Sequence, residues 1–233
     1  MHYGQCGARI AATERSELMA AEFRSLVVGR HARIGIAGDP ETATEAWLIL
    51  HGYGMLARGI LHWFRGAESA KRLLVAPEGL SRFYTELSGG KRAVGASWTT
   101  REDVDHELED QYQYLEHAVK HYVPATLPLQ VHGFSQGVST GTRWAIRTGR
   151  PIARLVGWAG AVPEQVTADL LQRKLGQEPL HLVVGDKDAI VPPAQVEADA
   201  IRLRTGGLDV RVHTFDGTHR VHEGVLAEFS TPR

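Results

Sequence analysis

Short apolar runs recur along the chain, separated by stretches with a helical spacing of apolar positions. The runs are rich in Val, Leu and Ile and lie at residues 23–28, 33–37, 46–50, 72–76, 127–132, 154–159, 180–184 and 210–215. Continuous apolar runs of this length are typical of strands buried on both faces, as in a parallel sheet. The first two runs flank Gly29-Arg30-His31 and predict an opening hairpin, which implies one antiparallel edge.

The stretches between the runs predict helices. The clearest covers residues 104–122, where apolar positions three or four residues apart give one apolar face. Further helices are predicted at residues 55–64, 136–147, 166–175, 194–204 and 221–229. Strands that alternate with helices predict an α/β fold, a three-layer α/β/α sandwich around a mostly parallel sheet of about seven or eight strands.

The length and composition indicate one globular domain. The chain has 233 residues, of which 43% are hydrophobic and 23% are charged. Because α/β folds often exceed about 200 residues as one unit, we expect a single domain over residues 1–233 with no large separate cap domain. The 26 Lys and Arg residues are balanced by 27 Asp and Glu residues, so the chain lacks the basic excess that binding to nucleic acid requires.

The chain also lacks sequence signals for a membrane or for secretion. Its longest apolar run, residues 155–163, is about half of the roughly 20 residues that a bilayer span needs. Residues 1–15 have no apolar signal core, and Cys6 has no second cysteine with which to form a disulfide or a zinc site. We therefore expect a cytoplasmic protein. The sequence does not indicate an oligomeric state.

One sequence motif indicates a catalytic residue. Gly133-Phe134-Ser135-Gln136-Gly137 fits the pattern G-x-S-x-G, between a predicted strand and a predicted helix. At such a sharp turn the serine hydroxyl stands above the sheet edge, and the glycines avoid clashes that a Cβ would make. A serine that only caps the helix is the simpler alternative, but it leaves both glycines unexplained. We predict Ser135 as a nucleophile.

A serine nucleophile needs a base, and the base needs an acid that orients it. After a turn of this kind the chain order is serine, acid, histidine. Asp186 and Asp188 both follow the run at 180–184, and we favour Asp188 because Ala189-Ile190-Val191 would shield it from water. Asp186 fits a turn residue that caps backbone amides.

The predicted base is His219, which follows the last strand, with His222 as the alternative three residues later. The chain has 12 histidines, and two pairs suit two ligands of a metal ion: His117 with His121, and His219 with His222. No third ligand has a useful spacing, so we expect no metal.

Two backbone N–H groups are needed to bind the oxyanion that forms when the serine attacks. One belongs to Gln136, directly after the serine, and the other to Tyr53, between Gly52 and Gly54 in the loop after the strand at 46–50. Apolar residues close to the predicted strand ends are candidates for an acyl pocket, although each also fits ordinary core. They are Met55, Leu56, Trp98, Trp158, Ile190 and Val191. Residues 79–101 form a long connection that either covers the site or lies elsewhere on the surface.

The oxyanion loop has a rival interpretation. Residues 52–57 also fit G-x-G-x-x-A, and Glu78 ends the next strand, which is the layout of a dinucleotide-binding unit. This interpretation leaves Ser135, Asp188 and His219 without a role, so we expect no cofactor.

Four segments together resemble the α/β-hydrolase superfamily, and most closely its phospholipase/carboxylesterase branch. They are His51-Gly52-Tyr53-Gly54, residues 133–137, Asp188-Ala189-Ile190-Val191-Pro192 and Gly217-Thr218-His219. The resemblance implies a serine esterase that uses Ser135, Asp188 and His219, with oxyanion donors at Tyr53 and Gln136.

The sequence departs from the thioesterases of this branch. Met55 follows Gly54, where thioesterases typically have an acidic residue, and Gly95-Ala96-Ser97-Trp98 looks like a small-esterase variant. We expect hydrolysis of small to medium acyl esters, with a small-molecule ester as the partner. Thioesterase or lysophospholipase-like activity on the same triad and ligand binding without turnover are the alternatives.

Overall fold

The structure is a computed structural model that describes residues 22–86, 90 and 92–231. The chain divides into two units, Met1–His31 and Ala32–Arg233. Described residues 22–31 of the first unit form neither helix nor strand, so the strand predicted at 23–28 is wrong. An apolar run alone does not make a strand, which also needs a hydrogen-bonded neighbour. Cys6 and residues 1–15, on which the expectations about disulfides and secretion depend, lie outside the described residues.

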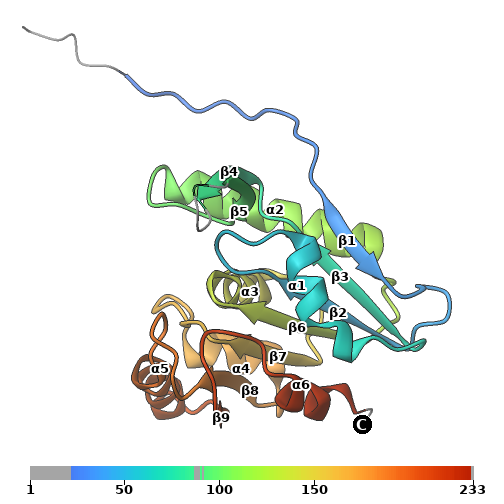
Figure 1. Cartoon of the computed structure of the whole chain (residues 1–233), viewed down its shortest axis with the longest axis vertical. Coiled ribbons are helices and arrows are strands. Elements are labelled where there is room, and N and C mark those ends of the chain that lie inside the picture. The colour runs from blue at the N-terminus through green and yellow to red at the C-terminus, as the bar shows by residue number, and fades with distance from the viewer. Residues whose placement is uncertain (1–21, 87–89, 91, 232–233) are drawn as a thin grey trace, which may run out of the picture. The chain divides into compact units, whose positions relative to one another are not determined.

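Seven strands of the second unit form one sheet, with β1 at one edge and β9 at the other (Figure 1). In spatial order they are β1 (Ile34–Ala37), β3 (Arg72–Pro77), β2 (Glu45–Leu50), β6 (Leu129–Phe134), β7 (Arg154–Trp158), β8 (Leu180–Gly185) and β9 (Val210–Phe215). β1 pairs with β3 in antiparallel orientation, and the other neighbours are parallel. The predicted antiparallel edge therefore forms through β3 and not through a hairpin.

Helices cover both faces of this sheet. One face packs against α1 (Ala57–Trp63), the short 3-10 helix η1 (Arg65–Ala67) and α6 (Glu223–Ser230). The other packs against α2 (Val104–Tyr122), α3 (Gln136–Arg147), α4 (Ala168–Leu175) and α5 (Pro193–Thr205). Successive residues of β2 alternate between the two cores, with Trp47 in the first and Leu48 in the second, as strand geometry requires. The predicted three-layer sandwich is confirmed.

A second, two-stranded sheet lies within residues 79–101. It is an antiparallel hairpin of β4 (Ser81–Glu86) and β5 (Arg92–Ser97), and residues 87–89 and 91 of its connection lie outside the described residues. Its base joins the loop before α1, because the Gly54 N–H donates to Ala96 O at 2.8 Å and the Ala96 N–H donates to Met55 O at 3.1 Å. The hairpin is thus continuous with the loop that holds Tyr53.

Two buried arginines fix the end of α6. Arg72 Nη2 donates to Ser230 O at 2.7 Å and Arg154 Nη1 donates to Phe229 O at 3.1 Å. The negative end of the helix dipole favours cations at this position. Arg72 Nε also donates to Glu45 Oε1 at 2.7 Å, so its charge has an acidic partner. The helix that follows His219 is therefore anchored to the strands.

The side chain of His132 in β6 is fully buried. Its ring stacks on Trp47 with centroids 4.2 Å apart, and Trp158 Nε1–H donates to its Nδ1 at 3.3 Å. Burial, followed by the charges of Arg154 and Arg72, holds the pKa of His132 well below its ordinary value. The folded protein therefore keeps this ring neutral under conditions in which the unfolded chain protonates it.

We expect the free energy of unfolding to fall as pH drops below about 6.5, because only the unfolded chain then takes up the proton of His132. The slope for one such group approaches about 1.4 kcal/mol per pH unit. His132→Gln keeps an acceptor for the Trp158 indole but does not titrate. Urea unfolding from about pH 6.5 to 5 should therefore show a flatter decline for this variant.

His106→Gln is the control, since this ring is exposed and its hydrogen bond to the Asp103 carboxylate raises its pKa. It should not flatten the decline. Parallel pH profiles for the wild type and His132→Gln would show that His132 does not set acid stability.

Candidate active site

Ser135 occupies the turn between β6 and α3 with a strained backbone. Its φ of 53° and ψ of −117° fall in a region that residues other than glycine rarely adopt. The turn is fixed on both sides: the Ser135 N–H donates to Trp158 O at 2.8 Å, and Ser135 O accepts from the Val138 N–H at 2.9 Å. A non-glycine residue held this way at the carboxyl edge of a sheet points to a functional role.

Close backbone packing explains the glycines around Ser135. A Cβ on Gly133 would lie 2.3 Å from Gly137 O, and a Cβ on Gly137 would lie 2.2 Å from Leu50 O of β2. A Cβ on Gly52 would lie 3.1 Å from the Ser135 Cβ. The loop after β2 therefore lies directly against the serine.

Asp188 and His219 form a hydrogen-bonded pair. The Asp188 side chain is 0% exposed, and its Oδ2 lies 2.8 Å from His219 Nδ1. Its Oδ1 accepts from the N–H groups of Ile190 and Val191, both at 2.9 Å. The carboxylate fixes the tautomer with the proton on Nδ1, which leaves the Nε2 atom of His219 as the basic nitrogen.

The His219 ring lies beside the turn at Ser135, because its centroid is 4.9 Å from that of Phe134. The alternatives from the sequence have other partners. Asp186 accepts from the Gly217 N–H at 3.0 Å, as a turn residue would. His222 caps α6, where its Nδ1 accepts from the Val225 N–H at 3.3 Å. The structure thus brings Asp188 and His219 together and leaves Asp186 and His222 in supporting contacts.

The loop that carries Tyr53 is held by His51. Burial lowers the pKa of His51, and its neutral ring bonds at both nitrogens: Nδ1 lies 2.8 Å from Gly52 O, and Nε2 accepts from the Gly79 N–H at 2.8 Å. Among the described residues, no acceptor is paired with the backbone N–H of Tyr53 or of Gln136. Both groups therefore remain available to a bound oxygen atom.

Glu78 has a local partner on each carboxylate oxygen. Oε2 accepts from the Ala57 N–H at 3.1 Å at the start of α1, and Oε1 accepts from Arg82 Nε at 2.8 Å. In a dinucleotide-binding unit this acid would face a ribose hydroxyl. Here it ties the start of α1 to β4. Sequence reasoning missed this role of Glu78 and that of His51, because Ala57 lies 21 residues from Glu78 and Gly79 lies 28 residues from His51.

The six pocket candidates occupy different environments. Leu56, Trp98 and Trp158 are buried, Met55 and Val191 are half-buried, and Ile190 is exposed. The structure does not bring the Trp158 ring to the site, because it packs on Phe64 and Phe229 in the core. Ile190 is 69% exposed, so Asp188 is shielded by neighbouring backbone and not by this side chain.

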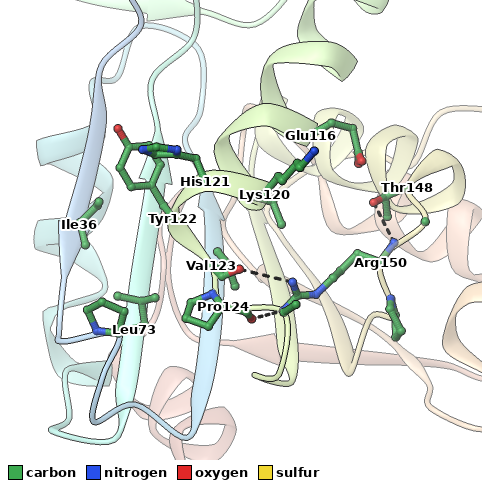
Figure 2. Close-up of a pocket in the computed structure, with 15 residues that line it drawn as sticks. Ile36, Leu73, Glu116, Lys120, His121, Tyr122, Val123, Pro124, Thr148 and Arg150 are labelled. Atoms are coloured by element: carbon green, nitrogen blue, oxygen red, sulfur yellow. Dashed lines mark hydrogen bonds between the residues drawn. The ribbon is translucent and has the colours of Figure 1, made fainter.

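A separate cavity of about 720 Å³ lies near the amino ends of the parallel strands (Figure 2). Its walls include Ile36, Leu73, residues 119–125 at the end of α2 and residues 148–151. Figure 2 shows Arg150 in the wall, where its Nη2 donates to Pro124 O at 2.7 Å. Since Ser135, Asp188 and His219 follow the carboxyl ends of their strands, this cavity is distinct from their site.

His121 lines this cavity and is thus remote from His219. Within residues 22–86, 90 and 92–231, no group of three or more His, Cys, Asp or Glu side chains is placed to hold a metal ion. In the same part of the chain, no helix combines the length and the apolar character that crossing a bilayer requires.

Comparison with solved structures supports the fold. The chain is similar to the acyl-protein thioesterase 2 of Zea mays, with 19% identity, a TM-score of 0.63, and coverage of 86% of this chain and 96% of that one. The carboxylesterase of Bacillus cereus is 16% identical with a TM-score of 0.60, and the match covers 85% of this chain and 92% of that one. A phospholipase/carboxylesterase of Dyadobacter fermentans is 17% identical with a TM-score of 0.58, and the match covers 87% of this chain and 96% of that one. No curated protein matches the chain significantly.

The sheet order and the serine turn after β6 are those of an α/β-hydrolase. A family model described as phospholipase/carboxylesterase matches residues 31–231, nearly the whole of the second unit. The chain therefore belongs to the phospholipase/carboxylesterase family, and hydrolase activity follows at this general level.

The turn at Ser135 can be tested through its packing. Gly137→Ala places a Cβ against the backbone oxygen of Leu50, which cannot move without displacing β2. We expect a loss of about 2–3 kcal/mol in the free energy of unfolding, or failure to fold. Gly149→Ala is the matched control, because its Cβ would meet nothing within 4 Å. Equal stability of the two variants in urea unfolding would refute the close approach of α3 to β2.

Proposed function

We propose that the protein is a serine carboxylesterase that hydrolyses small to medium acyl esters in one catalytic domain without a separate cap. The observation that carries this proposal is the hydrogen bond between His219 Nδ1 and the buried Asp188, next to a serine in a strained strand-to-helix turn. This is the arrangement that converts a weakly nucleophilic hydroxyl into an attacking group.

The reaction proceeds in two acyl-transfer steps. His219 Nε2 takes the Ser135 proton as Oγ attacks the ester carbonyl carbon, and Asp188 stabilises the imidazolium that forms. The N–H groups of Tyr53 and Gln136 bind the tetrahedral oxyanion. The bond to the alcohol breaks, and His219 returns the proton to the leaving oxygen. His219 then deprotonates a water molecule, which attacks the acyl-enzyme and releases the acid and Ser135.

The apolar character of the surrounding loops supports an acyl substrate. Met55 and Leu56 follow the oxyanion loop, and Ile190 and Val191 follow Asp188, so four apolar side chains flank the segments that carry the catalytic groups. We assign these four to acyl binding. Thioesters and lysophospholipids share the same chemistry and are distinguished by measuring rates on each. A cytoplasmic location remains a prediction from the single cysteine.

Ser135→Ala should abolish both labelling by a fluorophosphonate probe and hydrolysis of p-nitrophenyl esters, because no other group supplies the nucleophile. We expect the loss in rate to be about 10⁴–10⁶-fold. In the wild type, kcat/KM over p-nitrophenyl esters and thioesters of graded acyl length should be highest for small to medium esters.

Ser139→Ala is the control for labelling, since this serine lies one turn later in α3 and its hydroxyl donates to Gln136 O at 3.0 Å. It should label normally. Labelling that persists in Ser135→Ala would assign the nucleophile elsewhere. A wild type that neither labels nor hydrolyses any ester would support ligand binding without turnover.

Asp188→Asn should lower kcat by about 10⁴-fold, because the amide no longer holds the productive tautomer of His219. Asp186→Asn is a matched control, since an amide oxygen still accepts from the Gly217 N–H. Its kcat should stay within a fewfold of wild type. Similar losses in both variants would reverse the assignment of the two acids.

A further inference from the structure

The two proposed oxyanion donors belong to different loops. The Tyr53 N–H follows β2 and the Gln136 N–H follows β6, so the chain does not fix one relative to the other. A tetrahedral oxyanion requires both donors at about 2.7–3.1 Å from one oxygen atom. Contacts between the two segments therefore set their separation, and besides the packing of Gly52 on Ser135 a side chain that bonds to both segments can fix it.

Trp98, which directly follows β5, makes this contact. Its indole Nε1–H donates to His51 O at 2.8 Å, two residues before Tyr53. Its ring stacks on the His51 ring with centroids 4.8 Å apart and an interplanar angle of 29°. Its backbone N–H donates to the side-chain Oε1 of Gln136 at 3.1 Å. One residue thus bonds to the loops of both donors.

Further bonds hold the Gln136 side chain in place. Its Nε2 donates to Thr99 O at 2.9 Å and to Ser97 Oγ at 3.1 Å, which fixes the orientation of the amide. Trp98 is only 4% exposed, so water competes little for its hydrogen bonds. Buried, fully bonded polar contacts of this kind have one arrangement and resist rotation.

We propose that Trp98 is a positioning residue that sets the spacing of the oxyanion hole through His51 and Gln136. This inference rests on the proposed function. It replaces the role expected from the sequence, in which Trp98 lines the acyl pocket. A displacement of about 1 Å at a catalytic group can cost about 100-fold in rate, so the spacing matters for kcat.

Trp98→Phe is the direct test, because it keeps an aromatic ring beside His51 and removes the indole N–H donor together with some ring volume. We expect kcat for a p-nitrophenyl ester to fall about 10–100-fold while KM stays within about twofold. The affinity for a trifluoromethyl ketone, which adds to the serine and forms an oxyanion, should fall in parallel with kcat.

Trp144→Phe is the matched control. Trp144 is 2% exposed, and its indole nitrogen has no hydrogen-bond partner among the residues that the structure describes. The same substitution there changes packing without removing a hydrogen bond. We expect kcat to remain within about twofold of wild type, with a modest fall in Tm.

Two outcomes would overturn the proposal. If Trp98→Phe raises KM and leaves kcat unchanged, Trp98 lines the acyl pocket and does not position the oxyanion hole. If the kcat of Trp98→Phe equals that of Trp144→Phe, the role of Trp98 is purely structural. If Trp98→Phe does not fold, Gln136→Met removes the other end of the contact and keeps the backbone N–H. It should show the same loss of kcat, and unchanged kcat would again overturn the proposal.

A different result would contradict the proposed function. A wild type without esterase activity or fluorophosphonate labelling would contradict both inferences. An active wild type with a fully active Trp98→Phe variant would contradict only the role of Trp98.

Discussion

The close approach of α3 to β2 is the constraint on which the site depends. Gly137 lets the start of α3 pass within contact of the Leu50 carbonyl, and this contact forces the sharp turn that presents Ser135. β6 lies between β2 and β7, so the loop after β2 reaches the serine on one side and the Trp158 carbonyl holds its backbone on the other. The loops after the next strands, β8 and β9, carry Asp188 and His219. Because these strands are adjacent and parallel, the loops that follow them lie side by side at one edge of the sheet, although they are distant in the sequence.

Much of this arrangement was predictable because it depends on local patterns. Apolar runs identified the parallel strands, and the spacing of glycines identified the turn at Ser135. The choice of Asp188 over Asp186 agrees with the hydrogen bond to His219, but the expected shielding by Ile190 does not form: its side chain is exposed, and its backbone N–H, with that of Val191, donates to the carboxylate. Local sequence shows which residues are near in the chain, but not which of their atoms will point inward.

Other features were not predictable, because their partners lie far away in the chain. β4 alternates half-buried and exposed residues, and the first half of β5 does the same before its last three residues are buried. Both strands contain charged side chains, so the hairpin lacks the apolar run that marks a buried strand. The run at 23–28 has the composition of a strand without the pairing. The Trp98 bonds to His51 and Gln136 span 47 and 38 residues. No pattern in a single sequence encodes such pairs.

The outer face of the hairpin has a consequence for protein engineering. Arg82, Tyr84 and Val94 are exposed, whereas Phe83 turns inward and packs on Tyr53 with ring centroids 4.9 Å apart. Outward positions of β4 and β5 are therefore expected to tolerate replacement without strain on the loop that carries Tyr53, apart from Arg82, which is tied to Glu78. Randomised libraries at the exposed positions Tyr84 and Val94 would therefore vary the surface of the hairpin while its hydrogen bonds to the loop that carries Tyr53 stay intact.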